Sequence, residues 1–351
     1  MKKVLFATTA LVASAGVASA QDLGISLEGF AEVGIAGGSG FEGALAPAPG
    51  ATDPNKTRLH NDIGIEIDAA GETDNGISFG FSFEIDDTNG NDRVNGAPGF
   101  DNEFAFISSG PVTFSMGEID GGLDRRVDEP AWGASLTDDH TTHVGFGAGG
   151  VPGNSTSGNG FDGVYDNQIA RLDYDMGAFG ASLSVEQDDT TTDLDASWAI
   201  GLSYGLELTG VALDFGAGYH TADEDNTNGL LTGLDEAWAL SAQAEFDNGL
   251  KLAAIYEQWT GSLGNDLDRW NIGAGYDFNN FSVEANYGEF TIDGGGLDGT
   301  HTGWGLAAQY DFGGGLEAQA GYGNSDFSTT AAGTVGTDSV DTWSLGLVMS
   351  F

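Results

Sequence analysis

The sequence alternates between apolar and small or polar residues over most of its length, and this alternation constrains the fold more than any other feature. In residues 77–85, isoleucine and phenylalanine occupy every second position, with serine, glycine and glutamate between them. Residues 281–287 and 304–310 follow a similar pattern. A period of two residues is typical of a β-strand. Because the second face is small or polar, we expect lipid on one side of these strands and water on the other.

The last predicted strand carries large apolar residues on one face and ends the chain on an aromatic. The face consists of Trp343, Leu345, Leu347, Met349 and Phe351. In water such a strand would leave an apolar, unpaired edge, which soluble proteins avoid. In lipid it is stable where it closes a barrel, since every backbone group then has a partner. We therefore predict that residues 340–351 close a barrel against the first strand, near residues 23–35.

Composition excludes several other classes of protein. The chain contains no cysteine, so a disulfide framework and thiolate chemistry are unavailable. Beyond the N-terminal segment, no apolar run approaches the roughly 18 residues that a spanning helix needs. The 58 glycines and the high charge would suit disorder, but 40% of residues are hydrophobic and regularly placed. The sequence thus predicts an all-β, transmembrane antiparallel barrel.

The N-terminus has the features of a secretory signal. Lys2 and Lys3 precede a mostly apolar stretch, and residues 18–20 read Ala-Ser-Ala, which suits cleavage before Gln21. We predict a signal peptide over residues 1–20 and one barrel domain over residues 21–351.

Short turns recur after an aromatic residue and an aspartate. They follow Tyr174, Phe246, Tyr276 and Tyr310, and their glycines and asparagines supply the positive φ angles that tight hairpins need. We interpret them as periplasmic turns with their aromatics at the membrane interface. The predicted strands are 23–36, 56–70, 76–87, 100–109, 112–119, 167–176, 179–187, 196–204, 210–220, 236–246, 249–259, 268–278, 281–290, 301–311, 315–324 and 340–351. This count is sixteen, but two more or two fewer stay open because the hairpin between Tyr204 and Gly210 is weakly marked.

One connection, residues 120–166 between strands five and six, is far longer than the others and alternates little. A long ordered connection is usually functional; here it would fold inward and narrow the barrel, although a loop on the outer surface is the alternative. It carries eight acids that we take as candidates for a pore constriction: Asp120, Asp124, Asp128, Glu129, Asp138, Asp139, Asp162 and Asp166.

Basic residues are expected on the wall that faces this loop. By strand parity, Lys56, Arg58 and Arg171 point into the lumen. Acids opposite bases would create a transverse field and influence ion preference; the alternative is that the bases only neutralise nearby carboxylates. Arg125 and Arg126, at the start of the loop, could brace it by pairing with the loop's own acids.

The net charge is strongly negative. Without Lys2 and Lys3, the 10 basic residues fall to 8 against 54 acids, a net charge of −46. Such a chain repels nucleic acid and attracts cations. No cofactor is required, but the acidic segments that contain Asp86, Asp87 and Asp92 and Asp223, Glu224 and Asp225 could bind structural calcium through hard oxygen ligands. Solvated acidic loops are the alternative.

Other chemistry has little support in the sequence. His140 and His143 are three residues apart, yet glycine-rich surroundings without helical periodicity favour a chance pair over a metal site. No G-x-S-x-G nucleophile motif is present, so we predict that the protein is not an enzyme.

The whole mature chain resembles the general porins of Gram-negative bacteria, and is most similar to the sixteen-stranded porins of alphaproteobacteria. The resemblance includes residues 110–117 before the long loop, residues 174–179 after it and the terminal Phe351. It implies an outer-membrane homotrimer with each loop inside its own pore, through which small hydrophilic solutes diffuse. It also implies that the barrel-assembly machinery reads the last strand.

The family's basic wall cluster is thin in this chain, which favours cations. Lipid and anionic lipopolysaccharide would surround the barrel, with divalent ions bridging the outer acids. The rival hypothesis is a secreted, acidic, calcium-binding surface or adhesive β protein, which would need neither an apolar outer face nor a terminal aromatic strand.

Overall fold

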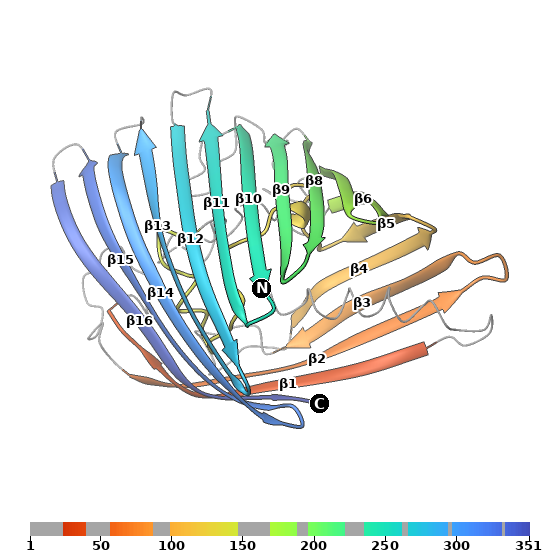
Figure 1. Cartoon of the computed structure of the whole chain (residues 1–351), viewed down its shortest axis with the longest axis horizontal. Coiled ribbons are helices and arrows are strands. Elements are labelled where there is room, and N and C mark those ends of the chain that lie inside the picture. Colours follow the sequence, from red (N-terminus) through yellow and green to blue (C-terminus); the bar gives the residue numbers. More distant parts are fainter. Residues whose placement is uncertain are drawn as a thin grey trace.

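The computed structural model describes residues 24–39, 57–86, 99–146, 169–187, 196–221, 235–261, 266–293, 297–331 and 334–351. The predicted signal peptide lies outside these residues. Sixteen strands form one closed antiparallel barrel, in which each strand pairs with its neighbours in the chain (Figure 1). The strands are β1 (Gly24–Gly37), β2 (Arg58–Glu72), β3 (Ser78–Asp86), β4 (Gly99–Ser109), β5 (Val112–Gly117), β6 (Ile169–Met176), β7 (Phe179–Glu186), β8 (Ser197–Leu208), β9 (Val211–Thr221), β10 (Glu236–Phe246), β11 (Leu250–Thr260), β12 (Asp266–Phe278), β13 (Phe281–Asp293), β14 (Leu297–Gly313), β15 (Leu316–Ala331) and β16 (Thr334–Ser350).

The first and last strands close the barrel where the sequence predicts. In the register of β1 and β16, Phe30 is opposite Ser350 and Gly37 is opposite Trp343. The backbone N–H of Phe351 donates to the carbonyl of Gly29 at 2.9 Å. Closure removes both sheet edges, which is the condition for placing a β-sheet in lipid.

The two faces of the wall have opposite character. On β2, Leu59 and Ile63 point outward and are 83% and 54% exposed, while His60 and Asp68 point inward and are 7% and 5% exposed. The exposed large apolar residues come from every side of the barrel, as the outer face of a lipid-embedded barrel requires.

Aromatic residues gather at one end of the wall. The rings of Tyr276, Phe278, Phe281, Tyr310 and Phe312 follow one another with centroids 4.5–5.9 Å apart. They flank the tight turns after β12 and β14. In the turn after β12, Asn279 has a φ of 55°. A band of aromatics at the barrel end is typical of the membrane interface.

Several strands are longer than the sequence predicts. β14 begins at Leu297 instead of 301, and β16 at Thr334 instead of 340. β8 continues to Leu208 and turns at Thr209 and Gly210, the latter with a φ of 88°. This hairpin, weakly marked in the sequence, is therefore an ordinary part of a sixteen-stranded barrel.

Candidate pore constriction

The chain does not cross to the next strand directly after β5 but lies inside the barrel over residues 118–146 (Figure 1). Its backbone binds strands that are far apart: the N–H of Gly122 donates to Ser184 Oγ on β7 at 2.8 Å, and that of Val144 to Ser325 Oγ on β15 at 3.0 Å. The described part of the long loop is thus spread flat over the inner wall. Residues 147–168, which include Asp162 and Asp166, lie outside the described residues.

Inward glycines of the wall allow this close approach. A Cβ atom on Gly201, Gly216, Gly288, Gly305 or Gly323 would lie 1.8–2.2 Å from a carbonyl oxygen of the loop. No side chain fits at such a distance, so the loop backbone rests directly on the strand backbones. We call these five residues the glycine track. Sequence reasoning treated them only as the small face of each strand and missed their contact with the loop.

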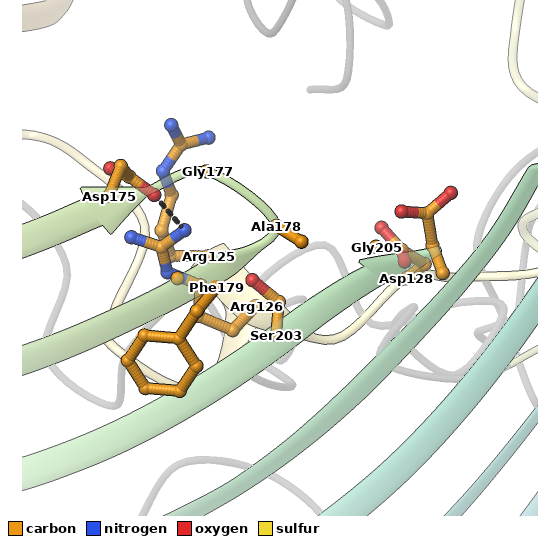
Figure 2. Close-up of a pocket in the computed structure, with 11 residues that line it drawn as sticks. Arg125, Arg126, Asp128, Asp175, Gly177, Ala178, Phe179, Ser203 and Gly205 are labelled. Carbon is orange, nitrogen blue, oxygen red and sulfur yellow. Dashed lines mark hydrogen bonds and ion pairs between the residues drawn. The ribbon is translucent and has the colours of Figure 1, made fainter. Parts of the chain in front are cut away.

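Arg126, in the short 3₁₀ turn η3 (Asp124–Arg126), anchors the start of the loop. Its guanidinium donates to Asp175 Oδ1 at 2.6 Å (Figure 2). It also donates to Ser182 Oγ at 2.6 Å and lies 3.7 Å from Asp173 Oδ1. Arg126 is 7% exposed. The expectation that it pairs with the loop's own acids is wrong, because the carboxylates beneath it belong to β6.

Arg171 faces inward as its parity predicts, but it does not line the pore as a free base. It is 8% exposed, and it donates from Nη1 to the carbonyl of Asp120 at 2.5 Å and from Nε to Asp173 Oδ2 at 3.0 Å. The loop covers it, and its charge is used in fixing the loop to β6. Of the two interpretations of the sequence, the pairing of Arg171 with a nearby carboxylate is therefore the one that the structure supports.

The two loop histidines bind the opposite part of the wall. His140 Nε2 lies 2.8 Å from Glu284 Oε1, and His143 Nε2 forms a short hydrogen bond with Asn286 Oδ1. Glu284 also accepts the backbone N–H groups of Trp132 and Gly133, at 2.7 and 2.5 Å. Both histidines therefore fix the loop to the wall, a role that their spacing in the sequence did not indicate. Among the described residues, no group of three or more histidine, aspartate or glutamate side chains is arranged to hold a metal.

Burial sets the protonation of these loop groups. His143 is 2% exposed, and burial lowers its pKa to about 4 against the pull of its bond to Asn286, so the ring is neutral at pH 7. Asp139 is 1% exposed and accepts hydrogen bonds from Ser344 and Thr137. Burial raises the pKa of Asp139, while these bonds oppose the rise. Asp139 therefore faces the wall and is not a pore-lining acid, which corrects its predicted position.

The other described acids of the loop are exposed to different degrees. Asp128 is exposed, and the other four are half-buried. These four are Asp120, Asp124, Glu129 and Asp138.

The inner wall of β1, β2 and β3 is acidic. Glu28, Glu66 and Glu84 are opposite one another in the strand register, and so form a row of carboxylates across three strands. Arg58 lies on the same face, while His60 is ion-paired with Glu32 at 3.1 Å. Lys56 lies outside the described residues. Arg58 therefore points inward as its parity predicts, but carboxylates outnumber it on the inner face of the described part of these strands.

The structure does not describe the arrangement of the predicted calcium ligands. Asp86 ends β3, and the other five predicted ligands lie outside the described residues.

Comparison with known proteins assigns the chain to a family. Residues 7–330 match the sequence profile of the Gram-negative porins. The chain belongs to this family. Its barrel is similar to solved structures of the porin of Rhodopseudomonas blastica. A triple mutant of that porin gives a TM-score of 0.63 at 19% identity, over 93% of this chain and 100% of the other. A variant with alanine in place of a lysine, an arginine, an aspartate and a glutamate gives the same values.

These structural likenesses establish the fold, a sixteen-stranded porin barrel. No curated protein gave a significant sequence match. In the part of the chain that the structure describes, no helix is long and apolar enough to cross a membrane.

Proposed function

We propose that this porin is a passive, cation-preferring channel of the outer membrane that admits small hydrophilic solutes and ions. The observation that carries the proposal is the carboxylate row of Glu28, Glu66 and Glu84 on the inner wall of β1, β2 and β3. Carboxylates that line a narrow aqueous passage concentrate cations and repel anions. The exposed Asp128 adds a negative charge on the loop side.

Assembly and cofactors are proposed from the family and the sequence. We propose a homotrimer in lipid and lipopolysaccharide, delivered through a cleaved signal peptide and inserted by the barrel-assembly machinery. Porins are channel proteins and not enzymes, so this porin needs no cofactor for its function. Calcium at the outer acidic loops stays a separate prediction. The secreted adhesive alternative gains no support from the family or the barrel.

Planar bilayer recording tests the proposal. Purified porin should give stepwise ohmic conductance increments, and liposomes that contain it should swell in small sugars. Absence of both in a protein that shows the heat-modifiable mobility of a folded barrel would exclude the channel function.

A further inference from the structure

Three of the few basic residues gather at one position on the inner wall. Arg125 and Arg126 belong to the loop, and Arg171 to β6. Arg126 and Arg171 are engaged by Asp173 and Asp175. Arg125 is different: it forms no ion pair with any carboxylate in the described part of the chain, and its Nε is buried there without a hydrogen-bond partner.

The site around Arg125 favours an additional carboxylate. Burial, and then the neighbouring Arg171, lower the pKa of Arg125, yet an arginine stays charged at neutral pH. An anion that reached the terminal nitrogens of this guanidinium would pair with its charge and would relieve repulsion among the three arginines. Asp173 and Asp120 also influence Arg125 electrostatically, but neither comes within ion-pair distance.

A cavity of about 280 Å³ opens beside Arg125 and has an acidic opposite end. Figure 2 shows Arg125 and Arg126 on one side, with Asp128 and Gly205 on the other. Asp214 belongs to the same acidic end, because a Cβ on Gly205 would lie 3.0 Å from its Oδ1. Asp128 is exposed and the side chain of Asp175 is 56% exposed, so the cavity opens to the aqueous lumen.

We propose that this cavity is a binding site for small zwitterions, with the carboxylate on Arg125 and the ammonium group on Asp128 and Asp214. The inference rests on the proposed channel function, because it names a class of solute that pauses inside the same pore. A volume just under the ~300 Å³ at which ligand pockets begin suits a short, flexible solute. Separated charges at the two ends select a solute that carries both signs over one that carries a single sign.

Current-block analysis of single channels tests this site. We use 6-aminohexanoate as the zwitterion, with hexanoate and hexylammonium as probes that each keep one charged end. Wild-type porin should show transient blocks with 6-aminohexanoate and at most weak blocks with the other two. In Arg125→Gln, block frequency should fall about tenfold or more, since a charge-assisted contact is lost. Asp214→Asn should reduce it by removing the other end of the site.

Lys251→Gln is the matched control, because it removes one positive charge from a partly exposed ion pair with Asp277 outside the cavity. It should leave the blocks unchanged. Arg125→Lys, which keeps the charge, should retain part of the block even if the glutamine variant assembles poorly. Equal blocks in wild type and Arg125→Gln, or equal blocks by hexanoate alone, would overturn the site. A channel that conducts normally without such blocks would refute only this inference, whereas absent conductance would refute the channel itself.

Discussion

At the scale of single residues, Arg126 makes more polar contacts with the wall than the neighbouring loop residues. Removing one partner of a buried ion pair typically costs about 3–5 kcal/mol. In Arg126→Gln, we expect the barrel to persist through its strand hydrogen bonds while the start of the loop detaches. Limited proteolysis in detergent should then cut within residues 118–146 about a hundredfold faster than in wild type. Lys251→Gln, which breaks a partly exposed pair, should behave as wild type; equal cleavage of all three proteins would contradict the anchor.

His143 predicts a pH dependence of the loop. Its folded pKa of about 4 lies below the ordinary value of 6.5, so the folded state binds fewer protons than the released loop between these pH values. The attachment is complete above pH 6.5 and weakens as the pH falls toward 4. The loss amounts to about 3 kcal/mol. We expect current fluctuations to become frequent over this window and to depend less on pH in His143→Gln; an unchanged pH profile in that variant would contradict the assignment.

Contacts between individual side chains were the features that the sequence predicted least well. Strand parity correctly predicted that Arg171 points inward, but it did not indicate that the loop covers this side chain. His140 and His143 were interpreted as a chance pair because their glycine-rich surroundings lack helical periodicity. No pattern in the sequence reveals a contact with Glu284 or Asn286, which lie more than 140 residues away. These contacts form only when the loop folds over the inner wall of the barrel.

At the scale of elements, alternation located the strands because lipid imposes it. Where β14 and β16 extend to Leu297 and Thr334, the sequence turns polar and rich in glycine and threonine, so the alternation that marks a strand is weak. The predicted strands therefore begin too late there. The glycine track shows what alternation does not reveal. An inward glycine looks the same in the sequence whether water or a loop lies against it.

Gly323 tests the contact between loop and track. A Cβ at Gly323 would lie 1.9 Å from the carbonyl oxygen of Asp139, whereas one at Gly24 would have no neighbour within 4 Å. In Gly323→Ala the loop must shift, so we expect altered single-channel conductance and greater current noise. Gly24→Ala should leave both as in wild type. Identical recordings for the two variants would show that the loop does not rest on the track.

The terminal strand predicts an effect on assembly. Phe351 is 80% exposed on the outer side, while its backbone bonds to Gly29 close the sheet. Replacing its side chain leaves those bonds intact, so Phe351→Ser should still refold in detergent. In cells we expect much less heat-modifiable barrel in the outer membrane than for Phe312→Ser, which removes another exposed aromatic. Equal amounts of the two variants would contradict an assembly signal at the terminus.

At the scale of the whole molecule, charge distribution decides what the barrel conducts. Architecture, strand number and the closing pair were accessible from the sequence because lipid on one face and water on the other leave few alternatives. The arrangement of charge inside the barrel was not accessible from the sequence. Its acids were expected on the loop and its bases on the wall, but the structure buries Asp139 and Arg171 and leaves a row of carboxylates on β1–β3.

Single-channel reversal potential across a potassium chloride gradient tests the central claim most directly. The porin should reverse at a potential of the sign set by potassium, and the triple variant Glu28→Gln, Glu66→Gln, Glu84→Gln should reverse closer to zero. A reversal potential of the sign set by chloride in the wild-type porin would contradict a cation-preferring channel.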